Sequence, residues 1–262
     1  MGTIHTDIVG NSMVLTIDYP EFANGVCEEN LSVFPEKFEE ASSNENVDHI
    51  ILRGSGAVFC LGGAASFLEE LCSLDQKRRY ESLRISQSWV RRILKSSKLV
   101  VAYADGLVAG FGVDLALSCD MILKSPRTVF SPSYNKLGLL PDGGGLLLLA
   151  HRIGPFAALE FFSSANEKCS EELGLARICN LEVSSDLSNE KLARKVRSEV
   201  RLSSMAFKYM KEELYKSWSV GFEEHLETIA MQQAELMGDP KFQFKLKQVG
   251  AFQRRMAKAS IG

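Results

Sequence analysis

Two glycine-rich turns are the segments of the sequence best suited to hold a developing negative charge. Leu61-Gly62-Gly63-Ala64 follows an apolar run that ends at Arg53, and Ala109-Gly110-Phe111-Gly112 follows a second run that ends at Tyr103. Glycine lets a ligand approach the backbone closely. The second turn opens a predicted helix, whose first N–H groups lack partners within the helix. Each turn alone indicates only a tight connection, but two converging turns could form an oxyanion hole.

Three side chains that could hold or move a proton lie farther along the chain. Asp142 stands in Pro-Asp-Gly, a sequence that is typical of a turn and would also suit a helix N-cap. Asp114 lies early in a predicted helix, where the helix dipole favours a carboxylate. Tyr134 is a poor base near neutral pH, because the ordinary pKa of tyrosine is about 10. Residue type alone therefore leaves structural and catalytic roles open for the two aspartates.

Short apolar runs predict the strands and longer periodic segments predict the helices that must position these residues. The predicted strands cover 14–17, 49–53, 99–103, 121–123 and 128–130. The predicted helices cover 28–42 (interrupted by Pro35), 66–74, 77–95, 113–118, the segment up to Arg152, 155–164, 189–201, 203–217, 221–237 and 242–256, with a loop over 132–145. Strands alternate with helices in the first half and helices dominate the last third. We therefore expect an α/β protein with a parallel-rich sheet and a helical C-terminal region.

The composition is that of an ordinary globular protein. Of the 262 residues, 45% are hydrophobic and 24% are charged. The net charge is −3 and there is no basic block, so we expect no nucleic-acid partner. No apolar run reaches the roughly 18 residues of a membrane span and no signal-peptide pattern opens the chain, so we expect no membrane partner and a cytoplasmic location.

Cysteines and histidines are scattered rather than grouped. No two cysteines have C-x-x-C spacing, and most lie among apolar residues, so we expect reduced, buried thiols rather than disulfides or zinc ligands. We therefore predict no metal site. The residues concerned are Cys27, Cys60, Cys72, Cys119, Cys169 and Cys179, with His5, His49, His151 and His225.

Three motifs in order resemble the crotonase (enoyl-CoA hydratase/isomerase) superfamily. They are Phe-Cys-x-Gly-Gly at Phe59–Gly63, the long Asp-Gly-x-x-x-Gly-x-Gly-Val-Asp-Leu-Ala-Leu-x-Cys-Asp motif at Asp105–Asp120, and Leu-Gly-Leu-Leu-Pro-Asp-Gly-Gly-Gly at Leu137–Gly145. The Pro20–Asn24 segment and Gly250-Ala251-Phe252 match more loosely. The resemblance implies a spiral of ββα units over 1–200, with the thioester site. It also implies a helical region over 201–262 that helps to form trimers, often paired into hexamers.

The resemblance also implies how a substrate would bind. Members of the superfamily hold the oxygen of an acyl thioester between two backbone N–H groups. These correspond here to Gly63 and Phe111, the second of which is usually glycine. Residues on the same segments are predicted to contact the substrate: Leu61, Gly62, Ala64, Gly110 and Leu137.

The acidic residues favour one reaction of the superfamily over another. Members that add water use two glutamates, and Asp114 and Tyr134 occupy those positions here, so the glutamate pair is absent. Double-bond isomerases commonly have an acid where Asp142 stands. We therefore expect a Δ3/Δ2-type enoyl-thioester isomerase in which Asp142 shuttles the proton. Asp114 would assist as a second acid or orient a group, and Tyr134 would bond to the acyl chain or to Asp142.

Two alternatives remain open at this point. One is a hydratase, dehydratase or decarboxylase of the same fold that acts on acyl-CoA or on carrier-protein-bound polyketide thioesters. The other is a catalytically silent scaffold. The carrier is also open, because Phe22 and Ala64 replace a basic and an acidic residue that coenzyme A-binding members often have. No cofactor is expected beyond coenzyme A or phosphopantetheine as part of the substrate.

Basic side chains that could meet phosphates or an acidic carrier lie on two predicted helices, although such groups are more often part of a solvated face. They are Arg91, Arg92, Lys95, Lys98, Lys245, Lys247, Arg254 and Arg255.

Overall fold

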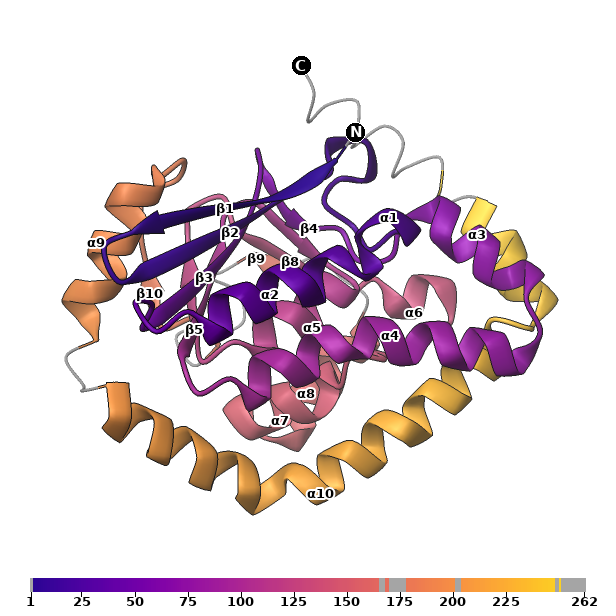
Figure 1. The fold of residues 1–262 in the computed structure, drawn as a ribbon. Coiled ribbons are helices and arrows are strands. Elements are labelled where there is room, and N and C mark those ends of the chain that lie inside the picture. Colours follow the sequence, from indigo (N-terminus) through magenta and orange to yellow (C-terminus); the bar gives the residue numbers. More distant parts are fainter. Residues whose placement is uncertain (1, 165–167, 170–177, 201–203, 248–249, 251–262) are drawn as a thin grey trace.

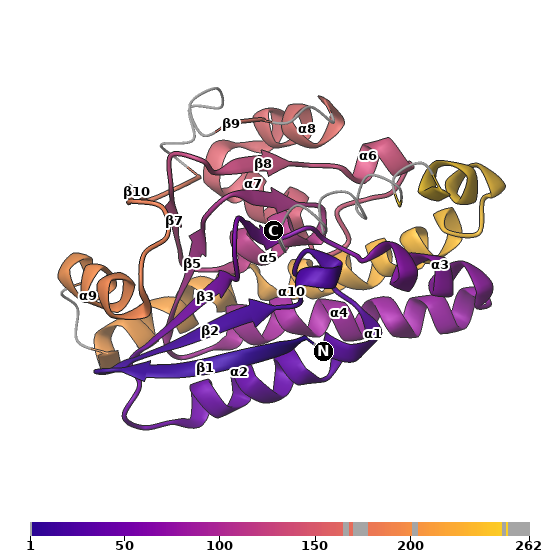
Figure 2. The same ribbon diagram turned by 90° about the horizontal axis from the view of Figure 1, so that it is seen from above.

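A sheet of six strands forms the centre of the computed structural model, which describes residues 2–164, 168–169, 178–200, 204–247 and 250. Its order is β1-β2-β3-β5-β7-β10, and β1 and β2 form an antiparallel hairpin while the other neighbours are parallel. The strands fan out from this N-terminal hairpin (Figure 2). Their bounds are Thr3–Val9, Ser12–Asp18, His49–Gly54, Leu99–Ala104, Met121–Lys124 and Leu181–Glu182.

A second sheet lies beside the first, and its strands alternate along the chain with those of the first sheet. It consists of β4 (Val58–Cys60), β6 (Leu107–Ala109), β8 (Val129–Ser131) and β9 (Lys168–Cys169), of which only β9 is antiparallel to its neighbour. The pairs β3–β4, β5–β6 and β7–β8 each consist of one strand from either sheet, and helices follow each pair. This repeated order is the predicted ββα spiral.

The central strands β2, β3 and β5 of the six-stranded sheet are buried on both faces, which explains why they appear as continuous apolar runs rather than alternating ones. In β5, Val100 and Ala102 face the large core, whereas Val101 and Tyr103 face a smaller cluster. That smaller cluster is closed by the helix α9 (Asn189–Glu199). All the predicted strands are confirmed, although β1 and the short strands β4, β6, β9 and β10 were not predicted.

Most predicted helices are also confirmed. Pro35 does not interrupt its helix, because it lies in the first turn, where no intrahelical N–H bond is lost. The predicted loop over 132–145 is wrong in part, since it contains the short helix α6 at Tyr134–Leu137. The other helices of the spiral are η1 (Pro20–Phe22), α1 (Glu28–Leu31), α2 (Val33–Ser43), α3 (Ala65–Ser73), α4 (Gln76–Lys95), α5 (Phe111–Ser118), α7 (Gly145–Ile153) and α8 (Pro155–Ser164).

The helices predicted at 203–217 and 221–237 are a single helix, α10 (Ser204–Leu236), which runs along α4 (Figure 1). Gly221 does not end it, because an exposed glycine costs a helix interior only about 1 kcal/mol. Phe222 and Leu226 of α10 belong to the same hydrophobic core as the spiral. Residues 240–247 are helical too, whereas the last part of the helix predicted at 242–256 lies outside the described residues.

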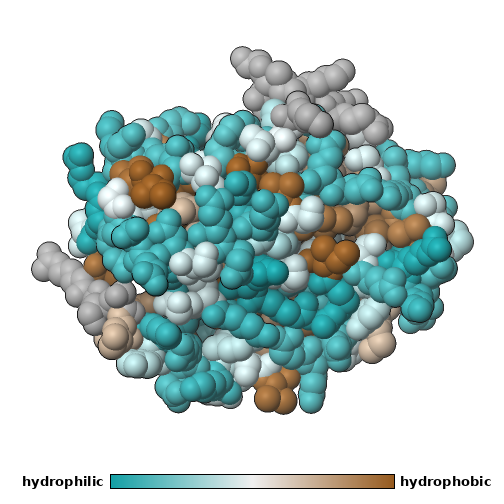
Figure 3. All heavy atoms as spheres, in the orientation of Figure 1, coloured by the Kyte–Doolittle hydropathy of each residue, from teal (hydrophilic) through white to brown (hydrophobic). Residues whose placement is uncertain are grey.

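The surface is mostly hydrophilic on the face shown in Figure 3. None of the described helices is long and apolar enough to cross a membrane. Aromatic side chains of the predicted C-terminal helices would suit either a trimer contact or the core of the chain. Among them, Phe222 and Phe242 are buried within the chain. Phe207 and Trp218 are half-buried, and Phe252 lies outside the described residues. Trimer or hexamer formation stays a prediction.

A buried ion pair fastens α10 to the rest of the molecule. The Lys211 ammonium donates to Asp120 Oδ2 at 2.8 Å and to the main-chain oxygens of Ile93 and Lys98 at 3.0 and 3.2 Å. Asp120 also accepts the Val100 N–H at 2.8 Å. Burial raises the pKa of Asp120 and the nearby ammonium opposes this rise. The pair therefore gives Asp120 a structural role.

We expect the substitution Lys211→Met to lower the free energy of unfolding by about 3 kcal/mol, because it leaves the Asp120 carboxylate, of which only 19% is exposed, without its ion-pair partner. Urea denaturation followed by circular dichroism would measure the change. Lys208→Met, at an exposed position of the same helix, is the matched control and should change stability by less than about 0.5 kcal/mol. Equal effects of the two substitutions would contradict this interpretation.

Candidate active site

The two glycine-rich turns meet in the structure. A Cβ atom added to Gly62 would lie 3.0 Å from the backbone nitrogen of Phe111 and 3.1 Å from the Cα of Gly110. Gly62 has a φ of +96°, a conformation that side chains rarely permit. The first turn is held by Val26, whose N–H donates to the Gly62 oxygen at 2.7 Å. The structure therefore places the backbone of Gly63 and that of Phe111 at one site.

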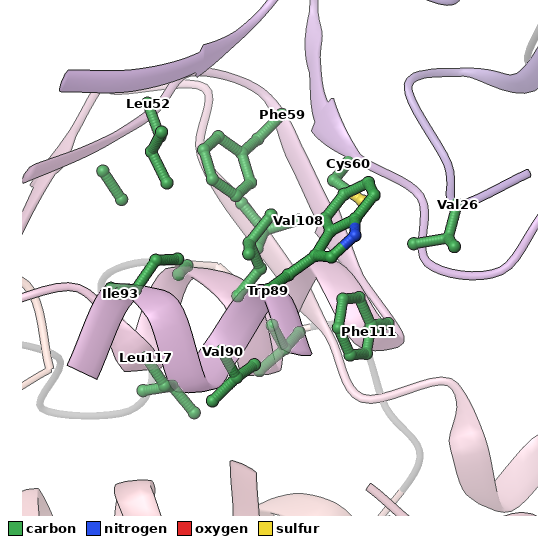
Figure 4. Packing of buried hydrophobic residues seen from close by; sticks show 14 of the residues in the cluster. Val26, Leu52, Phe59, Cys60, Trp89, Val90, Ile93, Val108, Phe111 and Leu117 are labelled. Carbon is green, nitrogen blue, oxygen red and sulfur yellow. The ribbon is translucent and has the colours of Figure 1, made fainter. Parts of the chain in front are cut away.

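Phe111 begins α5, so its N–H belongs to the first turn of a helix and has no acceptor within that helix. Its ring packs edge-to-face against the Trp89 indole, with centroids 6.2 Å apart (Figure 4). Both rings are buried in the large core. The Phe111 side chain, at a position where the resemblance implies glycine, is therefore accommodated by packing in the core. The backbone N–H of Phe111 is retained.

A narrow, mainly apolar cavity of about 70 Å³ opens beside the two turns. The structure brings three predicted substrate contacts to its wall, namely Leu61, Gly110 and Leu137. Gly62 lies behind the wall against Phe111, and Ala64 is the N-cap of α3 and does not line the cavity. The other lining residues are Val26, Gly63, Phe67, Leu68, Leu71, Leu83, Ser86, Phe111, Ser133, Tyr134, Leu139, Asp142, Gln233 and Met237.

Asp142 is the one carboxylic acid among the described residues that line this cavity. Burial raises its pKa to about 7, although the Tyr134 hydroxyl and a backbone N–H oppose the rise. The capping role that residue type suggested is not present, because α7 begins at Gly145 and its N-cap is Gly144. An aspartate with a pKa near neutrality can accept and return a proton at physiological pH.

Asp114 and Tyr134 form a buried pair behind the cavity. The Tyr134 hydroxyl donates to Asp114 Oδ2 at 2.8 Å, and the Gly143 N–H donates to the same oxygen at 2.7 Å. Burial and the nearby Asp142 raise the pKa of Asp114 well above its ordinary value. Asp114 is fully buried and does not line the cavity, whereas Tyr134 does. Asp114 is therefore placed to fix the other two groups rather than to touch a substrate.

Gln87, a fully buried residue of α4, was not among the predicted site residues. Its side-chain amide donates to the main-chain oxygen of Asp142 at 2.7 Å. In the sequence, Gln87 follows Ser86 and lies on the same apolar helix face as Leu83 and Val90. This position could have indicated its role, because a buried amide must find partners for several hydrogen bonds.

None of the described basic candidate side chains lines the cavity. Arg91 and Lys95 pair with Glu223 at 2.8 and 2.9 Å, and Arg92 pairs with Glu39 at 3.0 Å. Lys98 donates to main-chain oxygens of Asn44 and Val47. Lys247 is exposed and Lys245 half-buried, while Arg254 and Arg255 lie outside the described residues. Within the described part of the chain, no three metal-ligating side chains come together.

Comparison with known proteins fits this architecture. The family model for enoyl-CoA hydratase/isomerase matches residues 8–253. The chain belongs to the enoyl-CoA hydratase/isomerase family. Two solved structures share its fold with a TM-score of 0.84 each. One is an enoyl-CoA hydratase from Bacillus halodurans (22% identical, 94% of this chain and 99% of that chain). The other is an enoyl-CoA hydratase/isomerase from Xanthobacter autotrophicus Py2 (21% identical, 98% and 96%).

Among curated relatives of this family member, a trans-2-decenoyl-[acyl-carrier-protein] isomerase from Streptococcus mutans is 27% identical over 80% of this chain and 81% of its own length. A 1,2-epoxyphenylacetyl-CoA isomerase from Escherichia coli is 29% identical over 61% of this chain. The match spans 62% of that relative, which is less than two thirds of its length. Other relatives carry the name enoyl-CoA hydratase, as in Rhodobacter capsulatus (29% identical, 65% of this chain and 64% of the relative).

Gly145 of the Pro-Asp-Gly-Gly-Gly segment is expected to be needed for the Asp114–Tyr134 pair to form. A Cβ on Gly145 would lie 1.9 Å from Asp114 Oδ1, and this carboxyl group is too confined to move away. We expect Gly145→Ala to reduce stability by about 2 kcal/mol or more. Gly221→Ala, which meets open space in α10, should instead increase stability by about 0.5–1 kcal/mol. Thermal and urea unfolding would test the contrast, and a neutral Gly145→Ala would show that the segment adapts.

Proposed function

We propose that this protein moves a carbon–carbon double bond in an enoyl thioester, between the Δ3 and Δ2 positions, with Asp142 as the proton shuttle. The observation that carries the proposal is the position of one carboxylic acid, of pKa about 7, on an apolar cavity beside two converging backbone turns. A double-bond shift requires one base that serves two carbons. It does not require a second group to hold a water molecule.

The reaction begins when the Asp142 carboxylate takes a proton from C2 of a 3-enoyl thioester. The electron pair of the broken C–H bond delocalises over the conjugated chain and the thioester oxygen, which gives a dienolate. The same carboxyl group then returns the proton to C4, the C2–C3 double bond forms, and the thioester carbonyl is restored. Removal at C4 and return at C2 would run the reaction in the opposite direction. No other reactant is consumed.

The N–H groups of Gly63 and Phe111 are proposed to stabilise the dienolate oxygen. Hydrogen-bond donors fixed before the reaction can each contribute about 3 kcal/mol, because no reorganisation is needed as charge develops. The Phe111 donor lies at the start of α5, where the helix dipole adds a partial positive charge. The apolar wall keeps water away from the dienolate and strengthens both interactions.

Tyr134 and Asp114 are proposed to keep the shuttle in place. Burial raises the pKa of Tyr134 well above its ordinary value, so the phenol stays protonated and remains a donor. Its bond to Asp114 fixes the phenol ring beside Asp142 on the cavity wall. Asp114 also holds the Gly143 N–H next to Asp142 in the chain. In this account Asp114 is a positioning residue.

The carrier of the acyl group is proposed to be a phosphopantetheine thioester, on coenzyme A or on a carrier protein. The Streptococcus mutans relative is named for an acyl-carrier-protein substrate and the Escherichia coli relative for a coenzyme A substrate. Parallel assays with the two carriers would distinguish them.

A second candidate is the addition of water to a 2-enoyl thioester, since several relatives are named as hydratases. This reaction would need a water molecule held against the double bond, with Asp142 and Tyr134 as the polar groups on the cavity wall. Analysis of the products by mass spectrometry distinguishes the two reactions, because hydration adds the mass of water and isomerisation leaves the mass unchanged.

We expect Asp142→Asn to lower kcat/KM for isomerisation by about 1,000-fold, because the amide cannot accept the proton. The ultraviolet absorbance of the conjugated 2-enoyl thioester would follow the reaction, and circular dichroism would confirm folding. Asp239→Asn, at an exposed aspartate far along the chain, is the matched control and should retain activity. Full activity of Asp142→Asn together with loss in Asp114→Asn would overturn the assignment of the shuttle.

The rate should also depend on pH in a defined direction. Asp142 must be ionised to accept a proton, so kcat/KM should rise about tenfold per pH unit at acidic pH and level off above about 7. A profile with its acidic limb near pH 4 would show that the base is an ordinary exposed carboxylate. The profile should be measured on substrates whose thioesters are stable over the whole range.

A further inference from the structure

The side chain of Gln87 connects the loop that carries Asp142 to the two longest described helices. Its Nε2 donates to the main-chain oxygen of Asp142 at 2.7 Å and to that of Leu226 in α10 at 2.9 Å. Gln87 itself lies in α4 and has no exposed surface. One amide group therefore holds together three segments that are far apart in sequence.

The orientation of this amide is fixed by its neighbours. The two main-chain oxygens near Nε2 can only accept hydrogen bonds, so the amino group must face them. Oε1 accepts from Arg91 Nη2 at 3.2 Å and lies 3.5 Å from Arg84 Nη1, and a guanidinium can only donate. If the amide were rotated by 180°, its oxygen would face the two main-chain oxygens and its amino group would face the two guanidinium groups. The network is therefore complete in one arrangement only.

The network continues to the surface of α10. Arg91 donates through Nε to Glu223 Oε2 at 2.8 Å. Glu223 is also bound by Lys95 at 2.9 Å and by the Tyr215 hydroxyl at 3.1 Å. Arg91 is thus held by Glu223 and in turn donates to Gln87, so a chain of hydrogen bonds links the main chain of Asp142 to Glu223 on α10.

We propose that Gln87 is a positioning residue for the reaction, which fixes the Asp142 carboxyl group against the cavity by holding its main-chain oxygen. The inference rests on the proposed function and extends it, because it names a residue outside the cavity that controls the rate. Gln87 is not among the residues that line the cavity, so it acts through Asp142 and not by contact with the substrate.

The loss of Gln87 is expected to change both the rate and its pH dependence. Burial is the main cause of the raised pKa of Asp142, so a loop that loosens and admits water will lower this pKa. Arg84 and Arg91 lose Gln87 Oε1 as an acceptor in the variant. The titratable and charged groups on the surrounding elements are otherwise the same residues in variant and parent. These are Asp114 on α5, Tyr134 on α6, Cys60 on β4, Arg84 and Arg91 on α4, and Glu223 and Glu227 on α10.

The test compares Gln87→Met, which keeps the shape but not the hydrogen bonds, with Lys211→Met. Both variants lose buried hydrogen bonds to main-chain oxygens, but Lys211 lies away from the cavity. We expect Gln87→Met to lower kcat about 10- to 100-fold with KM changed by less than about twofold. The acidic limb of its pH profile should move to lower pH. Lys211→Met, assayed at a temperature at which both variants are folded, should leave kcat and the acidic limb unchanged.

A double variant tests the path through Arg91. If Arg91 acts by holding Gln87, Arg91→Met should lower kcat in the parent but not further in Gln87→Met. A Gln87→Met enzyme with the parent's kcat and acidic limb, or one that behaves as Lys211→Met does, would overturn the inference. A parent that moves no double bond would overturn the proposed function instead. The inference would then be judged by titrating the Asp142 carboxyl by ¹³C NMR in the parent and in Gln87→Met, where an unchanged midpoint would reject it.

Discussion

The carboxyl group of Asp114 is buried where three segments of the chain meet, and the geometry of the candidate site depends on it. One of its oxygens accepts both the Tyr134 hydroxyl of α6 and the Gly143 N–H of the segment before α7. Asp114 is itself carried by α5, whose first residue supplies one of the two proposed oxyanion donors. Asp114 thus links α5, the phenol of Tyr134 and the segment that carries Asp142.

This arrangement buries three ionisable groups together, which lowers the stability of the folded state and shifts the pKa of each group. Burial raises the pKa of Asp114, Tyr134 and Asp142 alike, and the proximity of the two aspartates raises that of Asp114 further. The Tyr134 phenol, whose pKa is raised further above an already high ordinary value, remains protonated near neutrality. Asp142 alone is brought to about 7, where loss and gain of a proton cost about the same free energy. The two aspartates therefore have different surroundings, and only Asp142 lines the cavity.

Much of this could be predicted from the sequence because the signals were local. Gly62 and Gly110 marked the turns, the apolar runs marked the strands, and the motifs around Asp114 and Asp142 marked the family. Contacts between distant segments could not be predicted in the same way. The bond between Tyr134 and Asp114 spans 20 positions and depends on α6, a single helical turn in a segment rich in proline and glycine. Gln87 and Asp142 are 55 positions apart, and Gln87 bonds to the main-chain oxygen of Asp142. Every residue has such an oxygen, so the identity of residue 142 does not indicate this contact. The continuity of α10 across Gly221 was decided by packing against α4, which outweighs a weak local preference.

The most direct test of the central claim is proton exchange during turnover in D2O. The protein would be incubated with 3-enoyl and 2-enoyl thioesters, on coenzyme A and on a pantetheine arm, and the products followed by NMR and mass spectrometry. We predict a moved double bond with no added water, and deuterium at C4 in those turnovers in which the Asp142 carboxyl exchanges its proton with solvent before it returns one. Added water, or no movement of the double bond on any thioester, would contradict the proposal.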